Sequence, residues 1–263
     1  MSRNFELLQR IGREQTLYTT PPVAEADQLT GQAVVISEPV VSTFSEPVGS
    51  TLAMSGGELE EFTKLVQRLF IMPGNDSPRS VVFAAAERGN GCSWVCGRVA
   101  EVLASQVSGS VCLVDANLRR PGLHLQFGVE NHYGLSDALL KPDPVRSFVS
   151  NVGRRNLWLV SCGSNAEGSQ NLLSADRMRS RLSELRAEFD YVLVDVAALG
   201  DANDAVLLGC GGDGVVLVLK ANTSRRESAR KAVQDLQTAK VRVLGAVLNQ
   251  RTFPIPESIY RKL

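Results

Sequence analysis

The sequence predicts an α/β protein in which a parallel β-sheet is flanked by helices on both faces. Beyond Pro78, short runs rich in Val and Leu alternate with segments of helical pattern. The runs are apolar throughout, as expected for strands that are buried on both faces. Strands and helices in this alternating order form parallel sheets through right-handed crossovers. Because ligands in such folds bind at the carboxyl ends of the strands, we expect the chemistry there.

The elements can be placed along the chain from these patterns. Strands are expected at 80–85, 111–116, 157–162, 191–197, 214–220 and 243–249, and helices are expected to begin at Ser93, Asp176 and Ser224. Upstream, residues 58–70 (ELEEFTKLVQRLF) predict a helix packed on the domain, because Leu, Phe and Val recur on one face. The apolar positions of this face are Leu59, Phe62, Leu65, Val66 and Leu69.

Four parts of the chain are expected. Residues 1–15 have the pattern of an amphipathic helix, and 16–56 are rich in Pro, Ser, Thr, Val and Gly without a sustained period, which favours a linker. The folded domain is expected at 57–252 and a C-terminal tail at 253–263.

Composition excludes several classes of function. The 263 residues carry 28 Lys and Arg against 28 Asp and Glu, so no overall field draws the chain to nucleic acid or anionic lipid. The 5 cysteines show no paired metal-ligand spacing, which favours a reducing cytoplasm. No apolar stretch approaches the ~20 residues of a membrane helix, and the N-terminus lacks a signal-peptide core. We therefore expect a chain that neither spans a membrane nor is secreted.

A glycine-rich turn follows the first expected strand directly and leads into a helix. Its residues are Gly89, Asn90, Gly91, Cys92, Ser93 and Trp94. Backbone N–H groups in such a turn, together with the helix dipole, favour a phosphate. The strict pattern G-x-x-x-x-G-K-[ST] is not met, because Cys92 stands at the lysine position. By itself the turn is equally compatible with a tight connection that binds nothing.

Two carboxylates stand at the expected strand ends beside this turn. Asp115 ends the second strand, with Asn117, Arg119 and Arg120 just beyond it, and Asp195 ends the strand at 191–195. Paired carboxylates beside a phosphate site suit Mg²⁺ with a nucleotide, held directly or through water. The alternative is that each Asp only caps the next turn.

Long segments of the chain resemble the bacterial tyrosine kinases (BY-kinases of the CpsD, CapB and Wzc type), which regulate exopolysaccharide and capsule synthesis. The resemblance runs through 113–140, 171–195, 213–237 and 241–251, and covers roughly 58–251. It implies a P-loop NTPase fold shared with MinD/ParA-type ATPases, ATP or ADP with Mg²⁺ as ligands, and a cytoplasmic protein peripheral to the inner membrane. The implied partner is the cytoplasmic segment of a membrane polysaccharide co-polymerase, a chain-length determinant, rather than nucleic acid.

The resemblance also implies roles for single residues. Gly89 and Gly91 would hold phosphates, Ser93 would bind Mg²⁺, Asp115 and Asp195 would hold the metal or its water, and Asn249 would lie near the base.

Several positions depart from the family pattern. The family lysine is Cys92, and the Thr that follows the family's Ser is Trp94, whose ring we expect to obstruct the pocket. Asn117 replaces the second Asp of Asp-x-Asp-x-Arg, and Val196, Ala197 and Ala198 replace a Thr-Pro-Pro turn, so a remodelled loop is expected there. The ring-forming motif Glu-x-x-Arg-x-x-Arg reads Glu60, Thr63 and Val66, and the tail offers only Tyr260 in place of a tyrosine cluster.

These losses favour a degenerate kinase, or pseudokinase, retained as a regulator or scaffold of polysaccharide export, with an intact kinase paralogue as a further partner. Backbone N–H groups still allow weak nucleotide binding. The alternative is an active tyrosine autokinase or ATPase in which Arg88, Arg119 or a partner's lysine replaces the lost charge. An ATPase that positions cargo is a third reading.

Two cysteines and a basic cluster each have two interpretations, whereas two histidines have one. Cys92 and Cys96 either form a reactive thiol pair at a helix N-terminus or fill a disused pocket. His124 and His132 are assigned to loop structure. The cluster Arg225, Arg226, Arg230 and Lys231 is either a solvated helix face or a dock for an acidic tail.

Overall fold

In the computed structural model, the described residues are 54–72, 77–153, 156–164, 175–201 and 204–251. All of them belong to the unit Ser45–Leu263. The second unit, Met1–Phe44, lies outside the described residues, as do the expected helix 1–15, nearly all of the expected linker and the tail 253–263.

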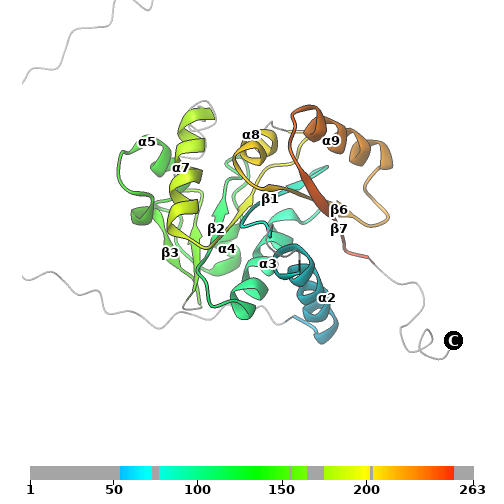
Figure 1. Cartoon of the computed structure of the whole chain (residues 1–263), viewed down its shortest axis with the longest axis horizontal. Helices are drawn as coiled ribbons and strands as arrows, with labels where there is room; N and C mark the ends of the chain where they lie inside the picture. The colour runs from blue at the N-terminus through cyan, green and yellow to red at the C-terminus, as the bar shows by residue number, and fades with distance from the viewer. Residues whose placement is uncertain (1–53, 73–76, 154–155, 165–174, 202–203, 252–263) are drawn as a thin grey trace, which may run out of the picture. The chain divides into compact units, whose positions relative to one another are not determined.

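The described strands form one sheet in the order β3-β4-β2-β5-β1-β6-β7 (Figure 1). Every neighbouring pair is parallel except β3 and β4, which are antiparallel. The strands are β1 (Ser80–Ala85), β2 (Val111–Asp115), β3 (Ser150–Asn151), β4 (Leu157–Val160), β5 (Tyr191–Asp195), β6 (Gly214–Lys220) and β7 (Val243–Asn249). The predicted α/β class with a mainly parallel sheet is confirmed.

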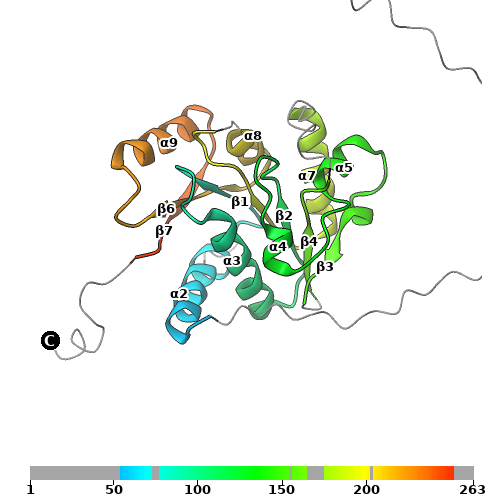
Figure 2. The same cartoon turned by 180° about the vertical axis from the view of Figure 1, so that it is seen from behind.

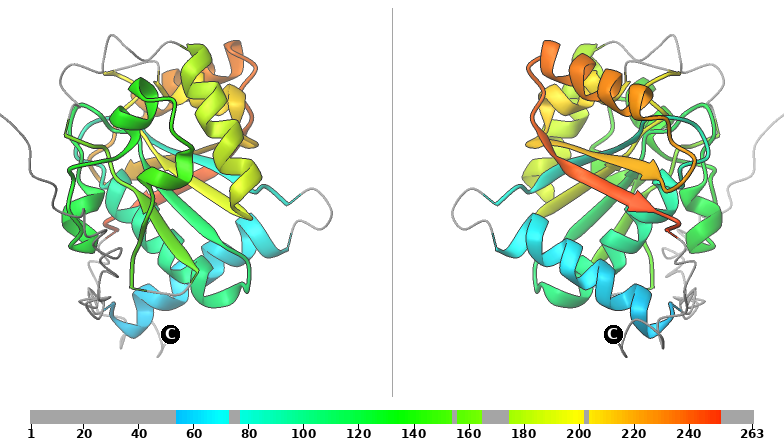
Figure 3. Two further views of the ribbon diagram at one scale, coloured as in Figure 1. Left: turned by 90° about the vertical axis from the view of Figure 1, so that its left-hand side faces the viewer. Right: turned by 90° about the vertical axis from the view of Figure 1, so that its right-hand side faces the viewer.

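Helices cover both faces of this sheet (Figures 1 and 3). One face carries α2 (Gly56–Val66), α3 (Cys92–Gln106) and α4 (Leu123–Phe127). The other carries α5 (Leu135–Leu140), α7 (Ala175–Glu188), α8 (Asp204–Gly211) and α9 (Arg226–Thr238). Successive residues of β1 face opposite layers: Val81 and Phe83 pack under α3, whereas Val82 and Ala84 pack toward α7 and α8. Strands buried in this way explain the continuous apolar runs.

Helix α2 is the predicted helix 58–70, and it lies beside α3 (Figure 2). A capping box begins it: Ser55 N donates to Glu58 Oε2 at 2.9 Å, and Glu58 N donates to Ser55 Oγ at 3.4 Å. A π-helical turn at Gln67–Ile71 continues it. Leu59 was predicted on the packed face but is 46% exposed. The packed face therefore begins one turn later, at Phe62.

Element boundaries agree closely with the patterns. Helices predicted from Ser93, Asp176 and Ser224 begin at Cys92, Ala175 and Arg226. The short elements β3, α4, α5 and α8, and the 3₁₀ turn Val145–Phe148, were not predicted. They are too short to establish a hydrophobic period. No helix among the described residues combines the length and apolar character needed to cross a bilayer.

The contact between α2 and α3 can be tested by substitution. Phe62 is 8% exposed, and its ring meets that of Trp94 edge to face, with centroids 5.4 Å apart. Phe62→Ala should lower the free energy of unfolding by about 3 kcal/mol in urea titrations. Leu59→Ala, on the same helix but exposed, should cost less than about 1 kcal/mol. Equal losses would show that α2 is not held through Phe62.

Candidate functional site

Residues 86–91 connect β1 to α3 at the carboxyl edge of the sheet, and together with the first two residues of α3 they form what we call the loop 86–93. Gly89 and Gly91 have φ angles of 79° and 78°, and Gly91 is the N-cap of α3. A Cβ on Gly91 would lie 2.4 Å from Asn249 Nδ2 and would have to displace that side chain, and the left-handed φ adds strain, so glycine is strongly favoured there. The first N–H groups of α3 have no acceptor within the helix, and the helix dipole is positive at this end. The loop therefore retains the backbone features of an anion site.

Two asparagines anchor the loop to the last two strands. Asn90 is buried, and its Nδ2 donates to Val218 O at 3.2 Å. Asn249 Nδ2 donates to Asn90 O at 2.9 Å, while its Oδ1 accepts from Gln250 N. Asn249 is thus held against the loop. Its contact with a base stays a prediction.

Cys92 and Cys96 are buried in the core, one helical turn apart. Burial raises the pKa of both thiols, and the charge of Asp195 raises it further. The reactive-thiol reading requires a lowered pKa, so it is wrong for both residues: burial outweighs the helix N-terminus. At the position of the family lysine, the chain therefore places a neutral group that packs inward.

Asp115 and Asp195 are register partners at the ends of the adjacent strands β2 and β5. Asp115 accepts hydrogen bonds from the N–H groups of Asn117 (3.2 Å), Gly122 (3.0 Å) and Leu123 (3.0 Å). Burial raises the pKa of Asp115 to about 6, although these donors oppose the rise. By accepting from Gly122 and Leu123, Asp115 also stabilises the start of α4. This agrees with the alternative prediction that the Asp caps the next turn.

Asp195 has a poorer environment than Asp115. Both of its oxygens are buried, and no donor in the described part of the chain meets hydrogen-bond geometry with them. The side chains of Ser93 and Cys92 are close enough to lower its pKa, but burial and then the charge of Asp115 raise it to about 8. At neutral pH Asp195 is therefore mostly protonated.

The oxygen atoms of Ser93 and Asp195 are ligands that fit a magnesium ion. Carboxylate and hydroxyl oxygens are the ligands this ion prefers, and it commonly uses only one or two protein carboxylates. A cation would also remove the cost of ionising a buried acid beside another acid. Ser93 and Asp195 are the residues that would hold it, since the oxygens of Asp115 already accept three backbone hydrogen bonds. No group of three His, Cys, Asp or Glu suited to a metal occurs among the described residues.

Trp94 contacts α2 through its ring. It packs on Phe62, and the Arg98 guanidinium lies 5.9 Å from the indole centroid. Arg98 is itself buried and ion-paired with Glu101. A contact of Trp94 with a nucleotide, including obstruction of the pocket, stays a prediction.

The loop after β5 keeps close to β1. Val196 N donates to Phe83 O at 3.1 Å, and Leu199 N donates to Ala85 O at 2.9 Å. Val196, Ala197 and Ala198 are buried, so apolar side chains fill the space where a Thr-Pro-Pro turn was expected from the family.

The cations named as possible substitutes for lysine both have acidic neighbours. Arg88 donates through Nε to Asp201, from the loop after β5. Arg119 lies near Asp204: burial raises the pKa of Asp204, and the positive charge of Arg119 opposes this rise. Asp201 was not predicted as a site residue. The one feature of the sequence that pointed to it is its position six residues after Asp195.

The remaining candidates are two histidines and a basic cluster. His124 is half-buried, with a pKa lowered by burial, and His132 is exposed. The basic cluster at the start of α9 is exposed and makes no ion pair within the described residues, which is compatible with both of its readings. Its members are Arg225, Arg226, Arg230 and Lys231.

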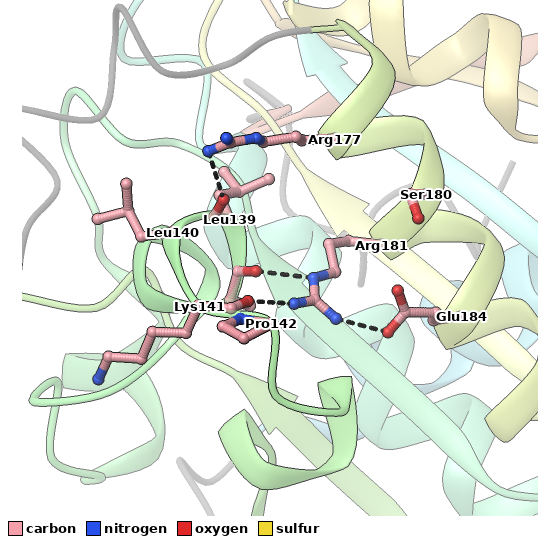
Figure 4. Close-up of a pocket in the computed structure, with 9 residues that line it drawn as sticks. Leu139, Leu140, Lys141, Pro142, Arg177, Ser180, Arg181 and Glu184 are labelled. Atoms are coloured by element: carbon pink, nitrogen blue, oxygen red, sulfur yellow. Dashed lines mark hydrogen bonds and ion pairs between the residues drawn. The ribbon is translucent and has the colours of Figure 1, made fainter.

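A pocket of about 340 Å³ lies between α5 and α7, with no lining residue from the loop 86–93 (Figure 4). The Arg181 guanidinium fills one side of it. Nε donates to Ala138 O at 2.7 Å, Nη2 donates to Lys141 O, and Nη1 pairs with Glu184 at 2.6 Å. These carbonyls belong to the C-terminal end of α5, so Arg181 caps that helix.

Removing this cap should destabilise the fold. Arg181→Ala leaves the carbonyls of Ala138 and Lys141 without their donor, and we expect a loss of about 2–4 kcal/mol in urea unfolding. Arg179→Ala is the matched control on the same helix, because Arg179 is exposed and its one ion pair among the described residues is with Asp176 at 3.5 Å. It should change stability by less than about 0.5 kcal/mol. Similar small losses for both variants would exclude the capping role.

Asp195 should also make stability depend on pH. Its folded-state pKa of about 8 exceeds the unfolded value of about 3.9, so the folded state binds more protons between these values. The free energy of unfolding contributed by this group therefore falls as pH rises from about 4 to about 8. Asp195→Asn should become more stable than wild type by up to a few kcal/mol over this range.

Urea titrations from about pH 5 to about pH 9 measure this difference. Asp190→Asn supplies a control of opposite sign, because hydrogen bonds from Ser110 lower the pKa of Asp190. That variant should lose stability relative to wild type above about pH 4. A constant difference between wild type and Asp195→Asn would exclude the raised pKa.

Comparisons with known proteins agree with this geometry. No protein-family model matches the chain. It is 34% identical over 171 residues to the tyrosine-protein kinase YwqD of Bacillus subtilis, which covers 65% of this chain and 72% of YwqD. It is 28% identical over 169 residues to the tyrosine-protein kinase etk of Escherichia coli, covering 64% of this chain but only 23% of etk.

Solved structures show the same fold. The chimerical protein CapA2B2 superposes with a TM-score of 0.68 at 20% identity, covering 80% of this chain and 92% of that chain. The kinase domain of Escherichia coli tyrosine kinase ETK superposes with a TM-score of 0.67 at 23% identity, covering 83% and 88%. A ParA family ATPase from Chlorobium tepidum gives 0.54 at 20% identity, covering 65% and 74%. The glycine-rich loop and the paired carboxylates agree with the match to YwqD, and this match shows that the chain belongs to the bacterial tyrosine kinase family; the chain shares the P-loop fold of the ParA-type ATPases.

Proposed function

We propose that this chain is a degenerate bacterial tyrosine kinase that binds nucleotide weakly or not at all and acts as a regulator or scaffold. The observation that carries the proposal is Cys92. Its buried, neutral side chain packs beside Asp195 at the position where phosphoryl transfer needs an ammonium group.

The energetic consequence of this replacement is large. A charged hydrogen bond contributes ~1.5–3 kcal/mol, so its loss lowers nucleotide affinity by roughly tenfold to more than a hundredfold. Charge that develops in the transition state adds a further loss of rate. Asn117 cannot replace a second carboxylate as a proton acceptor. Without a cation, ionising Asp195 costs free energy, so a metal ion would have to displace the proton of Asp195 in order to bind.

A magnesium ion, if bound, would neutralise charge between phosphate oxygens and would be held by Ser93 and Asp195. The chain's own contribution would then be limited to positioning. The backbone of the loop 86–93 orients the phosphates, and the asparagine contacts at Asn90 and Asn249 keep the loop rigid. Binding and catalysis are therefore separable in this site, because the backbone donors do not depend on side-chain identity.

Assembly into the family's ring is also reduced in this proposal. Val66, at the second arginine position of the motif, is fully buried under α3, and Glu60 pairs with Lys64 at 2.8 Å within its own helix. The side chains that would reach a neighbouring subunit are thus replaced by contacts within one chain. This supports a non-ring state for this protein.

The proposed setting is the cytoplasmic side of the inner membrane in a polysaccharide export system. The partners would be the cytoplasmic segment of a polysaccharide co-polymerase and an intact kinase paralogue. The support is membership in a family whose relatives here include YwqD, etk and the putative tyrosine-protein kinase CapB.

The decisive experiment compares nucleotide binding with phosphoryl transfer. Wild-type protein and Cys92→Lys are titrated with MgADP and MgATP by calorimetry, and both are assayed for transfer of radiolabelled phosphate with the membrane partner present. We expect weak or no binding by wild type, tighter binding by Cys92→Lys of at least about tenfold, and no transfer by wild type. Tight binding and turnover by wild type would instead establish the alternative, an active kinase or ATPase with a substitute cation.

A further inference from the structure

We infer that Arg88 is the phosphate-binding cation of the loop 86–93 and that Asp201 competes with the phosphate for it. The inference rests on the proposed function, because it concerns the weak anion binding that the backbone of this loop retains. The ligand class is a phosphate ester or pyrophosphate, and Asp201 serves as an internal anion in its place.

Arg88 and Asp201 join two loops at the carboxyl edge of the sheet. Arg88 precedes Gly89 in the loop 86–93, and its Nε donates to the carboxylate of Asp201. The Asp201 side chain is 21% exposed and that of Arg88 is 57% exposed, so the pair lies at the surface. The hydrogen bond to Asp201, and then the charge of Asp201, raise the pKa of Arg88, as expected for a formed ion pair.

The position of Asp201 is fixed by backbone contacts. Asp201 N donates to Ala198 O at 2.8 Å, and Leu199 N donates to Ala85 O at 2.9 Å, immediately before the loop 86–93. One turn and one hydrogen bond between the two loops therefore hold the carboxylate beside the loop 86–93. This carboxylate repels a phosphate that approaches the N-terminus of α3, and it also engages the one arginine of the loop 86–93.

An arginine in this place can serve a phosphate. A guanidinium matches carboxylate and phosphate oxygens with the same fork of donors, and it cannot lose its charge. The Arg88 side of the pair is mostly exposed, and water screens ion pairs at such a surface, so exchange of Asp201 for a phosphate costs little. The guanidinium would then supply part of the charge that Cys92 does not.

The other acid of the loop, Glu87, offers a matched control. It is half-buried, has the same charge as Asp201, and makes no ion pair among the described residues. Glu87→Gln therefore removes one negative charge from the same region without releasing Arg88. A difference between Asp201→Asn and Glu87→Gln reports the competition itself.

Calorimetric titration with MgADP, and separately with inorganic pyrophosphate, tests the inference. It is run on the full chain in the wild-type and the Cys92→Lys backgrounds. We expect Asp201→Asn to bind roughly three- to tenfold more tightly than its parent, because it removes a repelling charge and frees the guanidinium. Glu87→Gln should bind less than about twofold more tightly, and Arg88→Gln combined with Asp201→Asn should lose the gain.

The inference is overturned if Asp201→Asn gains no more affinity than Glu87→Gln in both backgrounds, or if the gain survives without Arg88. Undetectable binding by every variant counts against it equally. Failure of the proposed function appears elsewhere, as phosphoryl transfer by the wild-type protein, and leaves the ratio between the two variants unaffected.

Discussion

Burial of two carboxylates side by side is the constraint on which the site depends. β2 and β5 pair so that Asp115 and Asp195 end together, fully covered by side chains and helices. Two neighbouring carboxyl groups buried in this way cannot both ionise unless a cation or hydrogen-bond donors stabilise the charges. Asp115 has donors in the turn that begins α4, whereas Asp195 has none of ordinary geometry among the described residues. The fold therefore keeps a proton on Asp195 where an active site of this kind would place a metal and a lysine nearby.

The replacement of lysine by Cys92 follows the same logic. A lysine here would face a nucleotide, and without the nucleotide it would need a carboxylate partner in a largely apolar setting. A thiol avoids that requirement, because burial only keeps it protonated. The loop backbone is nevertheless unchanged in kind, since Gly91 has room for no side chain beside Asn249. Within these eight residues, the backbone shape of an anion site is thus present while the cation expected from the family is not.

The sequence predicted the features that depend on pattern. Apolar runs between helical segments are visible without any partner, so β1, β5 and β6 and the start of α3 were placed to within two residues. The meeting of Asp115 and Asp195 followed from their position at strand ends. Contacts set by tertiary distance were not predictable in this way: the raised pKa of Cys92, the packing of Trp94 on Phe62, and the ion pair of Arg88 with Asp201. Each of these features depends on residues from separate elements, so the hydrophobic periodicity of a single segment cannot predict it.

Under the proposed function, the departures from the family pattern at the nucleotide site and at the ring motif have one explanation. In a ring, one subunit's nucleotide site faces another subunit, as the family resemblance implies, so a chain that does not transfer phosphate, as proposed, would not need that neighbour. Helix α2 is then free to pack on its own chain, and Val66 is buried where an arginine would reach outward. The edge-to-face contact of Phe62 with Trp94 adds apolar burial to this arrangement. A chain with these contacts gains stability as a single subunit, which suits a regulator that binds a partner more than an enzyme that assembles to act.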